Sequence, residues 1–179
     1  MYIWVGADVD GQISIIKEIT RKAEGEIGFA HSNFTLPLHI SLKMSFRVDD
    51  EVSGEVTDSI AKLFNSFGRF EVTVKGIEHF GNIVWIRMGE SEELNLIHDR
   101  LNGMLSEKYG VGLHPYDCDY MFHTTLFMDD DEEKVGAAYL RVKDAPLPEK
   151  LTIDKLVIGT SQSGGLGTYK VIKTYELGE

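Results

Sequence analysis

Two hydrophobic periodicities alternate along the chain. Residues 2–9 are rich in β-branched and aromatic side chains and predict a strand. From Asp10 onward apolar side chains recur every three or four positions, which predicts a helix that Gly25 and Gly28 end. Residues 36–46 carry an apolar side chain at every second position, so they predict a strand with one core face and one polar face.

The remaining segments continue this alternation. Helices are predicted over 51–67, from Ser91 onward, and from the acidic run 129–133 to about Arg141. Strands are predicted at 69–80, 82–88, 121–128, 151–160 and 167–176. No linker or change in composition divides the chain. We therefore expect one α+β domain over residues 1–179, built on antiparallel sheets.

Charge changes this picture. The 179 residues include 18 basic and 29 acidic side chains, for a formal net charge of −11. A protein that grips long RNA or DNA usually has a basic surface, so the balance argues against that partner but leaves room for one local phosphate site. The chain has neither an apolar run long enough to span a membrane nor a basic signal-peptide start. Because Cys118 is the single cysteine, no internal disulfide is possible, and we expect a cytoplasmic protein without a membrane partner.

A short internal repeat is the most informative feature of the sequence. Residues 39–44 read His-Ile-Ser-Leu-Lys-Met, and residues 123–128 read His-Thr-Thr-Leu-Phe-Met. The histidine, leucine and methionine recur, and the third position is a hydroxyl residue in both copies. Each copy falls on a predicted strand, and neither strand contains an acidic residue. The repeat indicates two similar halves.

The spacing within each copy has a chemical meaning. Residues two apart on a strand point the same way, so His39 shares a face with Ser41, and His123 shares one with Thr125. If the halves face each other, two imidazoles and two hydroxyls converge. One neutral imidazole can then act as general base while a protonated one acts as general acid. The hydroxyls can donate hydrogen bonds to a phosphoryl oxygen, and such a site needs no metal.

The paired His-x-Ser/Thr motifs on strands resemble the 2H phosphoesterase superfamily, which includes RNA 2′,5′-ligases and RNA 2′,3′-cyclic phosphodiesterases. The resemblance implies a bilobal, pseudo-twofold fold with antiparallel sheets lining a central cleft and helices outside. It also implies metal-independent hydrolysis of a 2′,3′-cyclic phosphate or 2′,5′-phosphodiester in a small nucleotide or RNA end, without a cofactor. His39 and His123 would be catalytic, and Ser41 and Thr125 would bind the phosphate. Serine replaces the commoner threonine in the first motif, and Phe122 stands where many relatives have proline.

Two further residues are candidates for the cleft. Lys43 lies two positions beyond Ser41 and could hold a phosphate, although an ordinary surface lysine is the commoner interpretation. Phe127 lies two positions beyond Thr125 and could stack on a base, although packing in the core or at its rim is at least as common. The other histidines form no ligand pair typical of zinc, so no metal site is expected; they are His31, His79, His98 and His114.

Two alternatives to hydrolysis remain open. The same cleft could hold a nucleotide without turning it over, in which case the protein is a binding module. It could also catalyse the reverse reaction as an RNA 2′,5′-ligase. Ligation predicts a need for longer RNA and a strong dependence on salt.

Overall fold

The computed structural model describes residues 1–29, 36–165 and 167–178, and in it eight strands form one antiparallel sheet in the order β6-β3-β4-β5-β2-β1-β7-β8. The strands are β1 (Tyr2–Asp8), β2 (His39–Arg47), β3 (Phe70–Phe80), β4 (Ile83–Met88), β5 (His123–Met128), β6 (Lys150–Ile153), β7 (Lys155–Ser161) and β8 (Lys170–Glu176). The α-helices are α1 (Ser14–Ile27), α2 (Ser53–Phe64), α3 (Glu92–Tyr109) and α4 (Glu132–Val142). Short 3₁₀ helices span Asp10–Ile13 and Pro115–Asp117. The predicted α+β class is confirmed.

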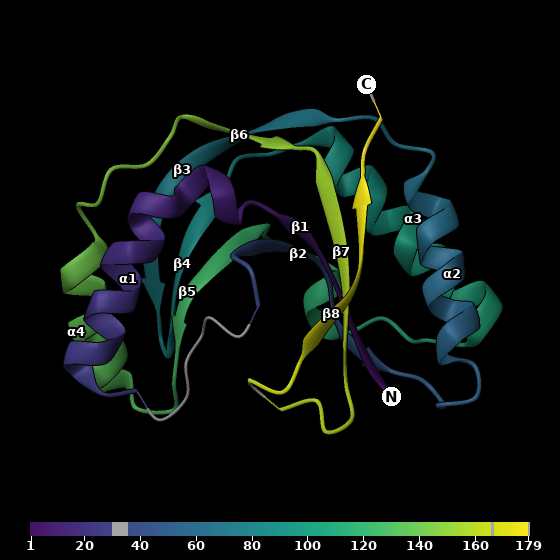
Figure 1. Cartoon of the computed structure of the whole chain (residues 1–179), viewed down its shortest axis with the longest axis horizontal. Coiled ribbons are helices and arrows are strands. Elements are labelled where there is room, and N and C mark those ends of the chain that lie inside the picture. The colour runs from purple at the N-terminus through teal and green to yellow at the C-terminus, as the bar shows by residue number, and fades with distance from the viewer. Residues whose placement is uncertain (30–35, 166, 179) are drawn as a thin grey trace.

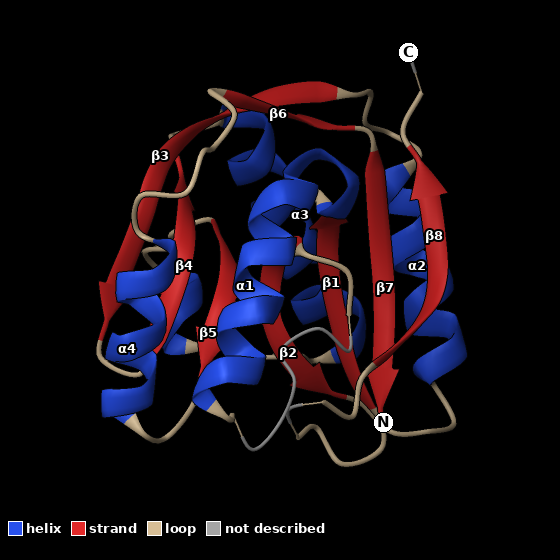
Figure 2. Cartoon of the chain, turned by 60° about the vertical axis from the view of Figure 1, so that its left-hand side comes forward, coloured by secondary structure: helices blue, strands red, loops and turns tan. Residues whose placement is uncertain are grey.

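The sheet bends into an arch with helices on its outside (Figure 1). Helices α1 and α4 pack together against the half made by β3, β4 and β5, and α3 packs on β2 with α2 beside it. Figure 2 shows α1 and α4 in front of β4 and β5, and α2 beyond β7 and β8. The predicted two-lobed arrangement is thus observed, with β2 and β5 side by side where the lobes meet.

Local sequence explains the helix ends. Ser91 caps α3 by accepting a hydrogen bond from the backbone N–H of Leu94, which satisfies a donor that has no partner within the helix. Helix α1 ends at Gly28, whose φ of 78° lies in the left-handed region. Gly25, predicted to help end this helix, lies inside it instead. No helix among the described residues is both long and apolar enough to cross a membrane.

The segment predicted as one strand over 151–160 is two strands. Strand β6 ends at Ile153 and pairs with β3, whereas β7 begins at Lys155 and pairs with β1. The chain changes lobe between them, at Asp154, whose carbonyl accepts a hydrogen bond from the Leu177 amide. Residues on both sides of the break are buried, so the hydrophobic pattern does not reveal it.

Candidate active site

The two repeated motifs meet on the central strands of the sheet. Strands β2 and β5 are antiparallel, and Ile40 lies opposite Thr124, both fully buried. Continuing this register by one residue places His39 opposite Thr125 and Ser41 opposite His123. Neighbouring residues alternate faces, so these four side chains lie on the sheet face opposite to that of Ile40. The imidazoles occupy a diagonal pair of positions, which in sheets are about 7–8 Å apart.

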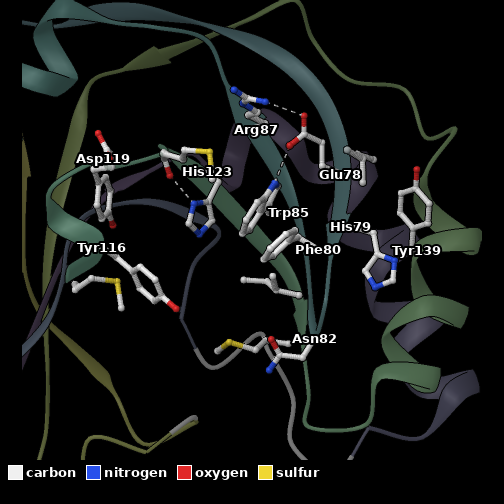
Figure 3. Close-up of a pocket in the computed structure, with 16 residues that line it drawn as sticks. Glu78, His79, Phe80, Asn82, Trp85, Arg87, Tyr116, Asp119, His123 and Tyr139 are labelled. Carbon is white, nitrogen blue, oxygen red and sulfur yellow. Dashed lines mark hydrogen bonds and ion pairs between the residues drawn. The ribbon is translucent and has the colours of Figure 1, made fainter. Parts of the chain in front are cut away.

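Both imidazoles are held in the same way. Nδ1 of His39 lies 2.7 Å from the carbonyl oxygen of Pro37, and Nδ1 of His123 lies 2.7 Å from that of Met121. A carbonyl oxygen can only accept, so each Nδ1 carries the hydrogen. In the neutral ring Nε2 therefore has a free lone pair. Figure 3 shows the bond from His123 and its ring turned into a cavity.

Each histidine also packs against a tryptophan from the neighbouring strand. The Trp4 ring of β1 lies edge-on to His39 with centroids 4.1 Å apart, and the Trp85 ring of β4 is tilted over His123 at 4.6 Å. A Cβ on Gly6 would come within 2.5 Å of the Trp4 ring and 3.2 Å of the His39 ring, so glycine is needed there. The chain contains two tryptophans, and both support the motif histidines.

The histidines differ in their environments. Burial, with a smaller contribution from the nearby His123, lowers the pKa of His39 to about 4, although the bond to Pro37 opposes the shift. Burial also lowers the pKa of His123. Both rings are therefore neutral in the free protein near pH 7. The electrostatic effect of His123 on His39 is consistent with their diagonal positions on the adjoining strands β2 and β5.

A cavity of about 790 Å³ opens beside the second motif. His123 lines it, together with Phe80 and Trp85 on one side and Tyr116 on the other (Figure 3). The described residues that line this cavity do not include His39, Ser41 or Thr125. Of the four motif residues that form the array, His123 is therefore the one that borders this cavity.

Arg87 is a cation next to His123 that was not predicted as a site residue. It lies opposite His123 in the β4–β5 register and lines the cavity. Its Nη1 lies 3.3 Å from Oε1 of Glu78, and Oε2 of Glu78 accepts a hydrogen bond from the Trp85 indole at 3.2 Å. The alternation Ile83, Trp85, Arg87 places these residues on one strand face, which is a signal in the sequence that could have indicated them.

Lys43 does not reach the cleft, contrary to the predicted role, and it is not a surface lysine either. Its side chain is 2% exposed, and its ammonium lies 2.7 Å from the fully buried carboxylate of Asp117. Lys43 also donates to Oδ1 of Asn102. Burial works to raise the pKa of Asp117, but the hydrogen bonds from Lys43 and the His114 amide outweigh it and lower the pKa.

Phe127 is likewise turned away from the cleft. The ring is fully buried and stacks on Phe29 with centroids 5.4 Å apart, so its predicted role in base stacking is wrong and the core interpretation holds. The cause is a bulge, because Val84 lies opposite Phe127 while Trp85 lies opposite Thr125. One extra residue in β5 reverses the alternation.

The same irregularity occurs in the first motif. Val5 lies opposite Lys43 and Gly6 opposite Ser41, so Leu42 is the extra residue in β2, as Leu126 is in β5. The leucine is the fourth residue of both motifs. Beyond each bulge the methionine, Met44 or Met128, lines the cavity, whereas the strict alternation expected over residues 36–46 would place Met44 on the core face. The structural repeat therefore includes the bulge as well as the histidine and hydroxyl.

The loop before β5 is attached to this part of the core. The ion pair of Lys43 with Asp117 holds the short 3₁₀ helix, and the Tyr120 ring stacks on His98 at 4.5 Å. The Tyr120 hydroxyl is close to Ser41, and burial raises the pKa of Tyr120. Anchoring this loop also places the Met121 carbonyl that orients His123.

Within the described part of the chain, no cluster of three His, Cys, Asp or Glu side chains could hold a metal ion. His31 lies outside the described residues. His98 is buried, and its Nδ1 donates a hydrogen bond to the carbonyl oxygen of Leu42. The polar groups that the described residues bring to this site are imidazole, hydroxyl and guanidinium, together with the carboxylates of Glu78 and Asp119.

A bilobal α+β fold with paired histidine–hydroxyl motifs on its two central strands defines a class of two-histidine phosphoesterase-like proteins. The sequence model of the 2′-5′ RNA ligase superfamily matches residues 16–165. The chain belongs to this superfamily, and the resemblance predicted from the two motifs is confirmed. No curated protein matches the chain significantly in sequence.

Solved structures support the same fold. The Thermus thermophilus protein TT0787 is similar with a TM-score of 0.66 at 15% identity, covering 100% of both chains. E. coli LigT in complex with NADP+ is similar with a TM-score of 0.60 at 15% identity, covering 99% of this chain and 97% of that one. E. coli LigT in complex with 3′-AMP has a TM-score of 0.59 at 13% identity, covering 99% and 98%.

Proposed function

We propose that this protein is a metal-independent phosphodiesterase that hydrolyses a 2′,3′-cyclic phosphate or a 2′,5′-phosphodiester in a nucleotide or at an RNA end. The observation that carries the proposal is the array of His39, Ser41, His123 and Thr125 on two adjoining strands, with both rings held through Nδ1. Membership of the superfamily supports it. The E. coli LigT complexes with NADP+ and 3′-AMP support a nucleotide as the ligand.

In the proposed reaction water attacks phosphorus and one bond from phosphorus to a ribose oxygen breaks. His39 takes a proton from the water, because its lowered pKa keeps Nε2 unprotonated. The bound phosphate anion raises the pKa of the imidazole beside it, so His123 holds a proton and gives it to the leaving ribose oxygen. Ser41 and Thr125 donate hydrogen bonds to the non-bridging oxygens. The product is a phosphomonoester.

The first test is turnover of adenosine 2′,3′-cyclic phosphate by the wild type and by His39→Ala and His123→Ala. Each substitution removes a proton-transfer group, so we expect kcat to fall by about 10²–10⁴. Activity should be unchanged after treatment with a chelator. The rates are measured by chromatography of the product nucleotide.

Thr124→Val is the matched control, because Thr124 lies between the two site residues of the second motif but faces the core. Its hydroxyl has no hydrogen-bond partner within the described residues, so valine should preserve both fold and activity. Near-wild-type rates in either histidine variant, or loss of all activity with chelator, would contradict the proposed mechanism. Nucleotide binding without turnover by the wild type would favour the binding module instead.

A further inference from the structure

One polar group beside the first motif has no part in the proposed mechanism, the hydroxyl of Tyr120. It is buried and makes no well-formed hydrogen bond within the described residues. Most buried hydroxyls are paired, because leaving one unpaired destabilises the folded state. Hydrogen bonds that serve catalysis, however, are often poorly aligned until the substrate binds. The unpaired hydroxyl is therefore a candidate for a role in the filled site.

The ring of Tyr120 is fixed against the first motif. It stacks on the His98 ring with centroids 4.5 Å apart, and the Phe122 ring lies edge-on to it at 5.1 Å. Nδ1 of His98 in turn lies 2.8 Å from the carbonyl oxygen of Leu42, the residue after Ser41. These contacts hold the ring on two sides and leave its hydroxyl close to the Ser41 side chain.

The Tyr120 hydroxyl keeps its hydrogen. Burial is the main cause that raises the pKa of Tyr120, the charge of Asp117 raises it further, and the nearby Ser41 lowers it by less. That charge stays in place, because the Asp117 carboxylate lies 2.7 Å from the ammonium of Lys43. A tyrosine ordinarily titrates near pH 10, so a raised pKa leaves this group a donor over the whole range of an assay.

The two motifs differ in how firmly their own structure orients the hydroxyl. Thr125 is β-branched, so its methyl group restricts rotation about χ1. Ser41 lacks this methyl, and its hydroxyl can occupy any of the staggered rotamers. A hydroxyl has a single hydrogen to donate and lone pairs that accept. If Tyr120 donates to Oγ of Ser41, the hydrogen of Ser41 must point elsewhere, which leaves it available on the face that it shares with His39.

We propose that Tyr120 is a positioning residue, which donates a hydrogen bond to Oγ of Ser41 so that Ser41 donates its own hydrogen to a non-bridging phosphate oxygen. The inference rests on the proposed function, in which Ser41 binds the phosphate. Hydrogen bonds in such a chain polarise one another, so Ser41 becomes a better donor as charge develops on the oxygen in the transition state. Tyr120 acts through Ser41 and does not itself contact the substrate.

The test is a double-mutant cycle on turnover of adenosine 2′,3′-cyclic phosphate. Tyr120→Phe removes the hydroxyl and keeps the ring that stacks on His98. We expect kcat to fall by about 3- to 10-fold, the usual effect of one hydrogen bond. In a Ser41→Ala background the same change should alter kcat by less than about twofold, because no serine hydroxyl is left to orient. In a Ser41→Thr background the loss should also be small, because the methyl of threonine restricts χ1.

Tyr175→Phe is the matched control. The Tyr175 hydroxyl is also buried without a well-formed hydrogen bond within the described residues, but β8 lies at the edge of the sheet, away from β2 and β5. Its removal should leave kcat within about twofold of wild type. An equal loss from Tyr120→Phe in the wild-type and Ser41→Ala backgrounds, or no loss in either, would overturn the positioning role.

Calorimetry separates this outcome from failure of the proposed function. If wild type turns over no cyclic phosphate, the proposed function fails, and the same cycle is measured as affinity for 3′-AMP. Tyr120→Phe should then weaken binding by about 3- to 10-fold where Ser41 is present and by less than about twofold in the Ser41→Ala background. An equal change of affinity in both backgrounds would show that Tyr120 does not act through Ser41.

Discussion

The two site histidines share the same backbone hydrogen bond but not the same surroundings. His39 lies among β1, β2 and the Trp4 ring, whereas His123 borders the open cavity. Burial is the largest cause of the lowered pKa of both histidines. For His39 its effect is large enough to bring the pKa to about 4. Division of labour between two like residues can thus arise from solvation alone.

The low pKa of His39 predicts a dependence of stability on pH. The unfolded chain binds a proton at His39 below about pH 6.5, and the folded protein binds it only near pH 4. The unfolded state therefore carries more protons between these values, and stability falls as pH falls through this window. We expect a loss of about 3 kcal/mol from pH 7 to pH 4 through His39. Urea unfolding of wild type and His39→Gln at both pH values measures it.

His123 has a lowered pKa as well, so it contributes a loss of the same sign. The difference between pH 7 and pH 4 should nevertheless be smaller in His39→Gln than in wild type. A difference of the same size in both proteins would show that His39 titrates at its ordinary pKa in the folded state.

At the scale of elements, the ion pair of Lys43 with Asp117 joins β2 to the loop before β5. Removing the cation from such a buried pair leaves an uncompensated charge. We expect Lys43→Met to lower the free energy of unfolding by about 3–5 kcal/mol. Because the loop carries Tyr116 and the carbonyl that orients His123, catalysis should weaken also. Denaturant unfolding and kcat/KM measure the two effects.

Lys173→Met provides the comparison, since Lys173 forms an exposed ion pair with Asp58 on the surface. Exposed pairs contribute little, so this variant should match wild type in stability and rate. The double variant Lys43→Met/Asp117→Leu removes both charges together and should recover much of the lost stability. If Lys43→Met alone is as stable as wild type, the pair does not anchor the loop.

Most elements follow from the hydrophobic pattern, but the faces of the two motif strands do not. Strict alternation would place Lys43 on the same strand face as Ser41, and Phe127 on the same face as Thr125. In the structure the alternation is interrupted at the leucine of each motif. A bulge depends on how a strand pairs with its neighbour, and the sequence of a single strand does not reveal that pairing. The histidine and hydroxyl of each motif precede the bulge, which is why alternation places them correctly on one face.

At the scale of the whole molecule, the net charge of −11 bears on the size of the substrate. A site for one phosphodiester should release few counterions. We expect the slope of log kcat/KM against log salt to lie near −0.7, roughly the value for one phosphate of a single strand. RNAs of two and twelve nucleotides with a 2′,3′-cyclic end, assayed over a range of NaCl concentrations, give the two slopes.

The slope and kcat/KM should be alike for the two lengths, because the acidic surface offers the added phosphates no favourable contacts. A much steeper slope for the longer RNA, with a large gain in kcat/KM, would contradict this and favour the ligase alternative.

The overall class, the two lobes and the pairing of motifs were predictable because a repeat implies matched halves. The crossing of the chain from one lobe to the other at Asp154 was not predictable, because it depends on contacts between segments far apart in the chain.

Because the chain crosses between the lobes at Asp154 and at earlier points, each lobe is assembled from several separate segments. One lobe draws on residues 2–8, 39–64, 92–109 and 155–176, and the other on 14–27, 70–88, 123–142 and 150–153. The chain passes back and forth repeatedly, so no single cut yields two pieces that each hold a complete lobe. The two lobes also share the β2–β5 pair, and this interleaving favours a single cooperative transition. The diagonal of His39 and His123 lies across β2 and β5, at the seam where the two interleaved lobes meet.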